Sequence, residues 1–184
     1  MTKNITHKEA GRIAFICFSL LSVLCVCFIF LNSLDSGIIS YEKSTAVTDA
    51  INTSLDIVGI DESVPETDVR TFAHFSEFCL LTAFLSCALI FSPLKDILVD
   101  EVVPFRPILS LPLCFFVACT DELIQRFSDG RVMDFADVMI DTLGGFFAMS
   151  CFLLVCLTVH IIKLKKLQKR RYLAIKAIYR RKKV

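Results

Sequence analysis

Four apolar segments dominate this sequence, and each is long enough to cross a lipid bilayer. They cover about residues 13–34, 71–92, 102–127 and 135–162. At a helical rise of ~1.5 Å per residue, about 20 apolar residues span the ~30 Å hydrocarbon core. Because 55% of all residues are hydrophobic, a water-exposed surface could not accommodate them. We therefore predict an all-α membrane protein built as a four-helix transmembrane bundle.

The orientation of the spans is predicted from the positive charges beside them, because Lys and Arg are retained on the cytoplasmic side. With four spans and the N-terminus inside, 16 of the 20 Lys and Arg lie inside and 4 outside. The stretch from Ile161 to Val184 alone holds 11 of them and no acidic residue. We expect a multi-pass protein of the bacterial cytoplasmic membrane with both termini in the cytoplasm. The basic C-terminal helix is either a stop-transfer anchor alone or also a ligand for the anionic inner leaflet.

This topology divides the chain into four parts. They are an N-terminal segment with the first span (1–34), an extracytoplasmic acidic loop (35–69), a three-helix core (70–162) and a basic cytoplasmic tail (163–184). Within the loop, Val47, Ile51, Leu55 and Val58 recur at helical spacing and share one face. We predict a helix there, which either packs over the bundle or moves as a lid over a binding site.

The cysteines indicate neither a disulfide framework nor a thiolate metal site. All nine fall inside the apolar segments, where thiols behave as small hydrophobic groups. The long outer loop, which faces the oxidising side, contains none. We expect no cofactor and no nucleic-acid partner.

Ionisable side chains gather at the predicted outer ends of three spans. Because burying charge in a membrane is costly, ionisable residues in spans are rare and usually have a function. One group opens the second span at spacings of four and three, a second group closes the third span, and a third group begins the fourth span. All reach the same depth in the outer leaflet. We predict that they form one ligand-binding site from Arg70, His74, Glu77, Asp121, Glu122, Gln125, Arg131, Asp137 and Asp141.

Carboxylates outnumber arginines in this cluster, so some of them must share protons or another cation. One alternative is a structural network in which Arg70 and Arg131 neutralise carboxylates and fix the helix packing. A second alternative holds Mg²⁺ or Ca²⁺ through Asp121, Asp137 and Asp141, because hard cations prefer oxygen ligands. Our main interpretation assigns no metal ligand.

Small residues follow the acidic stripe on the fourth span. Gly144 and Ala148 lie one turn apart, which lets the backbone of another helix approach closely. Packing inside the bundle is the favoured interpretation, and self-association into a homo-oligomer through the same face is the alternative.

The polar motifs, taken in order, resemble the VanZ-like family. They are RTFAHFSEF at 70–78, DELIQ at 121–125, Gly130-Arg131, and DVMIDTLG at 137–144. The family pattern joins an Arg-Lys pair, His-Phe-x-Glu-Tyr, Asp-Glu-x-x-Gln, Gly-Arg and Asp-Val-x-x-Asn-Thr-x-Gly-x-x-x-Gly. The resemblance covers about residues 70–148 and departs from that pattern at Thr71, Phe78, Asp141 and Ala148. Asp141 places a carboxyl group where the family has a neutral amide.

The resemblance implies a membrane protein of bacterial envelopes, since the name-giving member is associated with low-level resistance to the glycopeptide teicoplanin. It implies no settled reaction. From the residues we expect binding of a polar lipid headgroup or lipid-linked envelope precursor at the outer leaflet, with arginines meeting anionic oxygens. The alternative is a headgroup hydrolase or transferase, for which His74, Glu77, Asp121 and Glu122 are the catalytic candidates. Enzyme activity stays open.

Overall fold

The computed structural model describes residues 7–93 and 106–181, and every regular element in these stretches is a helix. In chain order they are α1 (His7–Ser33), α2 (Gly37–Val58), α3 (Glu66–Phe91), the short 3₁₀ helix η2 (Arg106–Leu109), α4 (Ser110–Gln125) and α5 (Phe135–Arg181). By length and composition, four stretches of helix can cross a membrane: α1, α3, η2 with α4, and α5. The predicted all-α class with four spanning helices is confirmed.

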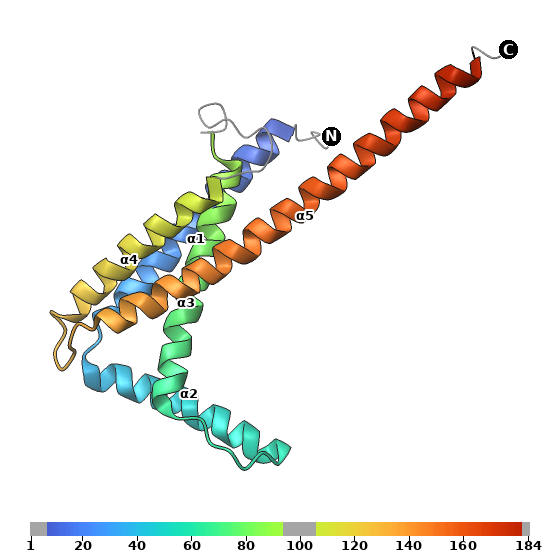
Figure 1. The fold of residues 1–184 in the computed structure, drawn as a ribbon. Coiled ribbons are helices and arrows are strands. Elements are labelled where there is room, and N and C mark those ends of the chain that lie inside the picture. Colours follow the sequence, from blue (N-terminus) through green and yellow to red (C-terminus); the bar gives the residue numbers. More distant parts are fainter. Residues whose placement is uncertain (1–6, 94–105, 182–184) are drawn as a thin grey trace, which may run out of the picture.

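The four helices that can span a membrane, α1, α3, α4 and α5, run side by side (Figure 1). α2 lies across the end of the bundle at which α3 begins (Figure 1). The start of α1 and the far part of α5 lie at the opposite end (Figure 1). This puts α2 and the turn between α4 and α5 at the same end of the molecule. The predicted start of the third span at Val102, and the turn around Lys95, lie outside the described residues.

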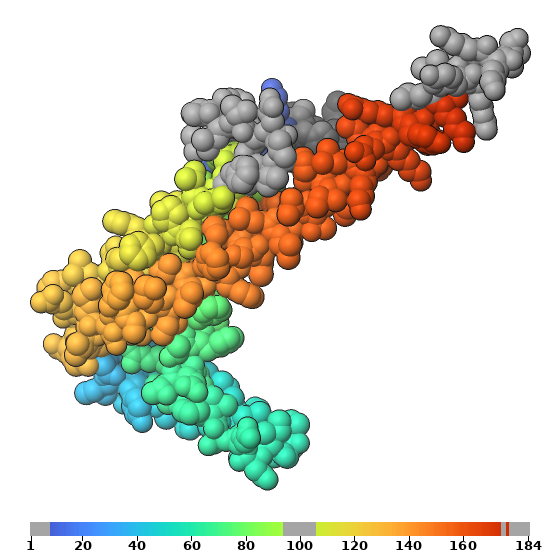
Figure 2. Space-filling model, in the orientation of Figure 1, coloured from blue at the N-terminus to red at the C-terminus, as the bar shows by residue number. Residues whose placement is uncertain are grey.

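The last helix is longer than the span predicted for it. Beyond residue 162, α5 continues without a break to Arg181. These 19 residues add about 28 Å of helix at ~1.5 Å per residue. Figure 1 shows this part of α5 projecting past the other helices, and the coloured atoms of α5 in Figure 2 also extend beyond them. The basic tail is therefore an extension of the fourth spanning helix and not a separate element.

The segment between the first two spanning helices does form a helix, as its apolar spacing predicted. α2 begins after Ser36, whose hydroxyl accepts a hydrogen bond from the Ile39 amide at 3.4 Å, and ends at Gly59 with φ of 81°. Its packing face differs from the predicted one, because Thr48 is its buried residue while Val47 is 52% and Val58 75% exposed. The Ser44 hydroxyl of α2 donates a hydrogen bond to Glu66 at the start of α3.

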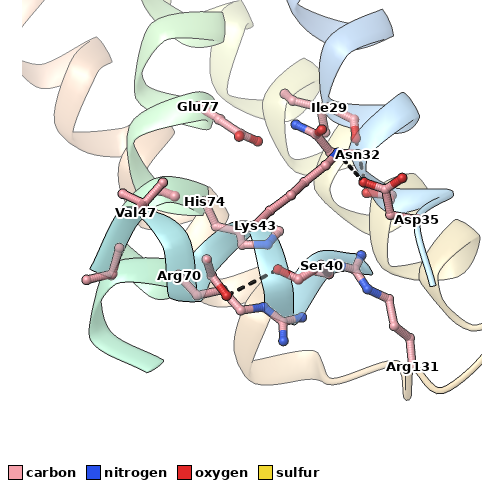
Figure 3. A pocket seen from close by; sticks show the side chains of 14 residues that line it. Ile29, Asn32, Asp35, Ser40, Lys43, Val47, Arg70, His74, Glu77 and Arg131 are labelled. Atoms are coloured by element: carbon pink, nitrogen blue, oxygen red, sulfur yellow. Dashed lines mark hydrogen bonds and ion pairs between the residues drawn. The ribbon is translucent and has the colours of Figure 1, made fainter. Parts of the chain in front are cut away.

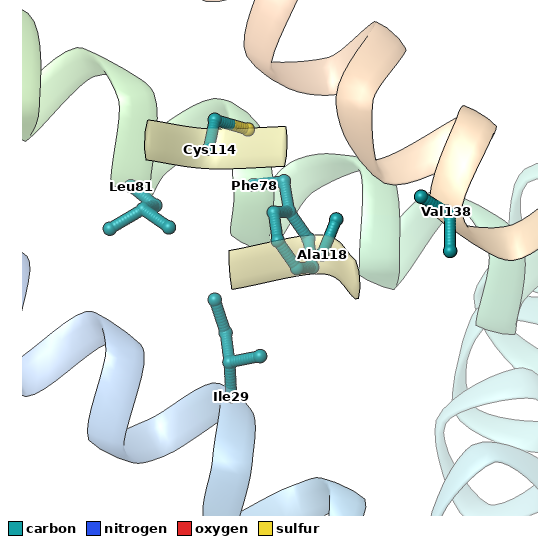
Figure 4. Close-up of a cluster of buried hydrophobic side chains, with 6 residues drawn as sticks. All are labelled: Ile29, Phe78, Leu81, Cys114, Ala118 and Val138. Atoms are coloured by element: carbon teal, nitrogen blue, oxygen red, sulfur yellow. The ribbon is translucent and has the colours of Figure 1, made fainter. Parts of the chain in front are cut away.

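A small apolar core lies where α1, α3, α4 and α5 meet. Its buried members are Ile29, Phe78, Leu81, Cys114, Ala118 and Val138 (Figure 4). Large apolar side chains such as Leu31, Phe116 and Phe146 remain more than half exposed on the outside. Spanning helices need only a thin packed seam, because lipid replaces water around them.

The helices α3 and α5 approach closely at a glycine pair. A Cβ atom built on Gly144 would overlap the backbone carbonyl of Phe75, and one on Gly145 would overlap the Cys114 sulfur. Ala148, one turn further on, is also buried. The predicted packing role of this small-residue face is confirmed. α3 occupies the face, so the face is not open for contact with a second copy. All nine cysteines are free.

Candidate functional site

Two adjoining cavities lie at the end of the bundle that carries α2. Their volumes are about 180 Å³ and 510 Å³. Three side chains line both of them: Arg70 and His74 from α3, and Arg131 from the turn between α4 and α5. Because the turn and the first helical turns of α3 meet here, residues 61 positions apart in the sequence share one wall.

The predicted stripe on α3 faces this space. Arg70, His74 and Glu77 all line the smaller cavity, as their spacing of four and three residues requires on a single helix face. In Figure 3 the His74 and Glu77 side chains extend from α3 toward α1 and α2. Asp137 on α5 lines the larger cavity.

Neither arginine of the wall has a carboxylate within 4.0 Å among the described residues. In the described part of the chain, the ion pairs within 4.0 Å are Lys43–Asp35 at 2.5 Å and His74–Asp141 at 3.7 Å. Arg131 donates a hydrogen bond from Nη2 to the Ser40 hydroxyl, while its Nε and Nη1 atoms are buried without a partner (Figure 3). Among the described residues, no arginine–carboxylate pair of the kind used by a structural network therefore lies within 4.0 Å.

Burial lowers the pKa of Arg131, and the positive charge of Arg70 nearby lowers it further. A guanidinium stays protonated despite such shifts, because its ordinary pKa lies far above neutrality. Arg131 therefore lacks a directly paired negative charge, and its Nε and Nη1 atoms lack hydrogen-bond acceptors among the described residues. A bound anion would supply both.

Behind the arginine wall lies a fully buried polar layer on α4. Asp121 accepts hydrogen bonds from the Ser33 hydroxyl and from Gln125 Nε2, the latter at 2.9 Å. Glu122 Oε2 accepts the backbone N–H of Asp134 at 3.0 Å and so fixes the chain before α5. These α4 side chains support the structure behind the cavities. The prediction that Asp121, Glu122 and Gln125 contact a ligand directly does not fit their positions, since neither cavity is lined by them.

Asp141 completes the buried layer from α5. Its side chain is 0% exposed, and neither carboxylate oxygen has a hydrogen-bond partner among the described residues. The Nδ1 atom of His74 lies 3.7 Å from Oδ1. Of the nine predicted residues, five therefore line the cavities and four stand behind them.

A family model described as VanZ/LLP1 matches residues 18–157. This is more than three quarters of the chain. The protein belongs to the VanZ/LLP1 family. It is a membrane protein of that family, as its four long apolar helices also require. Comparison with curated protein sequences and with solved structures finds no match.

The VanZ/LLP1 match begins inside α1, well before the motifs that carry the sequence resemblance. It thus includes the junction of α1 and α2, which supplies site residues that sequence analysis missed: Ser33, Asp35, Ser40 and Lys43. Lys43 is the single basic residue between Asp35 and Val69, and this isolated positive charge in an acidic segment could have identified it as a site residue. The Ser33 hydroxyl, at the end of an apolar run, could have been paired with an acid at the same depth.

The α1–α2 junction is held against the turn between α4 and α5 in this VanZ-family fold. Ser128 Oγ donates a hydrogen bond to the Ser33 carbonyl at 2.7 Å, and the Gly37 amide donates to the Asp129 carbonyl at 2.8 Å. Gly130 has φ of 75°, and a Cβ on Gly37 would overlap its backbone. These contacts place Arg131 beside α2, where its side chain lines both cavities.

Proposed function

We propose that this VanZ-family protein binds, without transporting it, the phosphate-bearing headgroup of a membrane lipid or of a lipid-linked envelope precursor. The single observation that carries the proposal is the wall shared by both cavities, where no carboxylate of the described chain pairs with Arg70 or Arg131 within 4.0 Å. Guanidinium groups present planar N–H donors that match the oxygens of a phosphate group.

The rest of the lining suits the polar remainder of such a headgroup. Lys43 lines the smaller cavity and adds a third cation, whose charge Asp35 partly offsets. Glu77 in the smaller cavity and Asp137 in the larger one offer acceptors for sugar hydroxyl or amine groups. Exposed apolar side chains surround the same end of the bundle and would meet the acyl or prenyl chain.

The membrane orientation is part of the proposal. The cavities lie at the end of the bundle that carries α2, opposite the basic part of α5 (Figure 1). Since Lys and Arg are retained in the cytoplasm, this arrangement supports inner termini and an outer-leaflet site. We further propose that the exposed basic part of α5 adsorbs to the anionic inner leaflet.

The proposal is tested by binding of farnesyl phosphate, with farnesol as the uncharged reference, to the protein in phosphatidylcholine nanodiscs. Farnesyl phosphate should bind saturably and be displaced by a long-chain phosphorylated prenol, whereas farnesol should bind at least ~10-fold more weakly, a difference of about 1.4 kcal/mol. Equal affinity for the two compounds would contradict a phosphate site.

A headgroup hydrolase or transferase is the second candidate function. It is favoured by one observation, the position of His74 on the wall of both cavities with Asp141 directly behind it. A carboxylate behind an imidazole orients it as a general base. Release of inorganic phosphate from farnesyl phosphate by wild-type protein, and none by His74→Gln, would establish an enzyme in place of a binding protein.

A contribution to teicoplanin resistance is the cellular consequence that we propose from the family resemblance. A protein that holds or shields an envelope precursor headgroup would change what a glycopeptide meets at the outer surface. The measurement is the minimal inhibitory concentration of teicoplanin in a bacterial host expressing the protein. It should rise for the wild type and return to the host value for the Arg70→Gln variant.

A further inference from the structure

Three side chains from three different helices converge directly behind the cavity wall. They are His74 on α3, Asp121 on α4 and Asp141 on α5, and one ligand atom from each lies within 4.8 Å of the other two. Both aspartates are 0% exposed. We propose that His74, Asp121 and Asp141 bind one divalent transition-metal ion of the Zn²⁺ or Mn²⁺ class.

Asp141 is the observation that calls for a bound ion. Both of its carboxylate oxygens are buried, and neither has a hydrogen-bond partner among the described residues. The Nδ1 atom of His74 is buried and lacks a hydrogen bond as well. Leaving a carboxylate in such surroundings is costly unless it is paired or coordinates a metal. A dication would balance the two aspartates and leave the cluster neutral.

The distance between His74 and Asp141 suits shared coordination. Nδ1 and Oδ1 are 3.7 Å apart, which is too long for a hydrogen bond. Two ligand atoms bonded at ~2.0–2.2 Å to one zinc ion, and separated by a wide angle, lie about 3.3–3.8 Å from each other. At 3.7 Å, Nδ1 and Oδ1 are therefore far enough apart for both atoms to bind one ion between them.

Asp121 is already oriented as a ligand by its neighbours. The Ser33 hydroxyl donates to Oδ1 and Gln125 Nε2 donates to Oδ2, so the carboxylate is held while a lone pair on each oxygen stays free. Such second-shell donors fix ligand carboxylates in metal sites. They also explain why Gln125 is buried at this position.

The ligand set decides the class of metal. One imidazole nitrogen with two carboxylates suits Zn²⁺ or Mn²⁺, whereas Mg²⁺ and Ca²⁺ prefer sites made of oxygen atoms alone. The site differs from the sequence-based alternative, which used Asp137. In the structure Asp137 lines the larger cavity and does not belong to the three-residue cluster. It also revises the main sequence interpretation, which assigned no metal ligand.

The metal site goes beyond the headgroup proposal and does not depend on it. His74 belongs to both the cavity wall and the cluster, whereas Asp121 and Asp141 belong to the cluster alone. The metal by itself is therefore the proper probe. A protein without any lipid ligand still binds the ion if the inference is right.

The experiment measures metal binding by the full chain, purified through an affinity tag that contains no histidine. After treatment with EDTA, the protein is titrated with Zn²⁺, Mn²⁺ and Mg²⁺, and with Co²⁺ as a visible-absorbance reporter. Bound metal is counted by mass spectrometry of the digested sample. We expect one Zn²⁺, Mn²⁺ or Co²⁺ per chain, and Mg²⁺ should not displace the bound ion.

Asp141→Asn is the decisive variant and Asp137→Asn its matched control, one helical turn away on α5. Loss of a second-shell partner alone lowers metal affinity ~10–100-fold, so the loss of a ligand in Asp141→Asn should lower it at least ~100-fold. Asp137→Asn should bind Co²⁺ as the wild type does. Should Asp141→Asn fail to fold, His74→Gln gives the same readout from a side chain that is 20% exposed. Wild-type protein that binds no transition metal, or Asp141→Asn protein that binds as tightly as wild type, overturns the inference.

Discussion

Gly144 on α5 packs directly against the backbone carbonyl of Phe75 on α3, leaving no room for a Cβ atom. This contact sets the geometry of the site. Phe75 follows His74 in the sequence, and Gly144 lies three residues after Asp141. The separation of the two helix backbones at the glycine therefore determines how close His74 and Asp141 can come.

We predict that Gly144→Ala destabilises the protein, because the new methyl group must push α5 away from α3. Overpacking of this kind costs typically ~1–3 kcal/mol. Gly11→Ala is the matched control, since nothing lies within 4 Å of the Cβ position of Gly11 in α1. The melting temperature in detergent should fall for Gly144→Ala and stay equal or rise for Gly11→Ala. Equal melting temperatures for wild type and Gly144→Ala would mean that the helices are not held at this distance.

The buried layer and the cavity wall should respond differently to mutation. Gln125→Ala removes the donor to Asp121 Oδ2 from a position that is 1% exposed. Stranding a buried acceptor costs ~1–3 kcal/mol, so the melting temperature should fall clearly. Arg131→Gln loses one hydrogen bond to Ser40 and leaves no carboxylate unpaired, so its melting temperature should change less. The reverse order would make Arg131 a packing residue and Gln125 dispensable for stability.

The sequence predicted the helices more completely than it predicted their contacts. Apolar length and periodicity identify spanning helices, because the backbone must satisfy its own hydrogen bonds in lipid. The same periodicity found α2 but misplaced its packing face. Its contact partner is the polar start of α3, where the Ser44 hydroxyl donates a hydrogen bond to Glu66, while Val47 lines the smaller cavity.

The site was predicted from the common depth of its residues in the membrane. Depth alone does not distinguish a side chain that contacts a ligand from one that lies behind it. Helical spacing correctly placed Arg70, His74 and Glu77 in one cavity. The i, i+4 spacing of Asp121 and Gln125 allows their hydrogen bond, but it does not show that the two side chains lie behind the cavities. Nor could it reveal the part played by Ser33, because that contact joins residues 88 positions apart.

The membrane orientation predicts a labelling pattern. In a background without the nine cysteines, Lys43→Cys should react with a membrane-impermeant maleimide in intact cells, because the Lys43 side chain is 59% exposed on α2. Lys169→Cys, exposed on the far part of α5, should react only after the cells are opened. Labelling of Lys169→Cys from outside would invert the topology and move the cavities to the cytoplasmic leaflet.

The basic end of α5 predicts adsorption to anionic lipid. A peptide of residues 161–184 should bind vesicles that contain phosphatidylglycerol, and five changes to Gln should weaken that binding by ~1 kcal/mol for each charge removed. The five positions are Lys165, Lys166, Lys169, Arg170 and Arg171. Unchanged binding at physiological salt would leave the stop-transfer role alone.

Binding of a phosphate group by the arginine wall is tested by comparing three single changes at the same end of the bundle. Arg70→Gln and Arg131→Gln alter the wall, while Arg126→Gln removes an exposed arginine that lines neither cavity. The measurement is the Kd of farnesyl phosphate for each protein in phosphatidylcholine nanodiscs. A hydrogen bond to a charged group contributes about 1.5–3 kcal/mol, so each wall variant should bind ~10–100-fold more weakly while Arg126→Gln binds as the wild type. Equal weakening of farnesyl phosphate binding by all three changes would indicate only a general effect of surface charge. No weakening by either wall variant would contradict a phosphate site at the arginine wall.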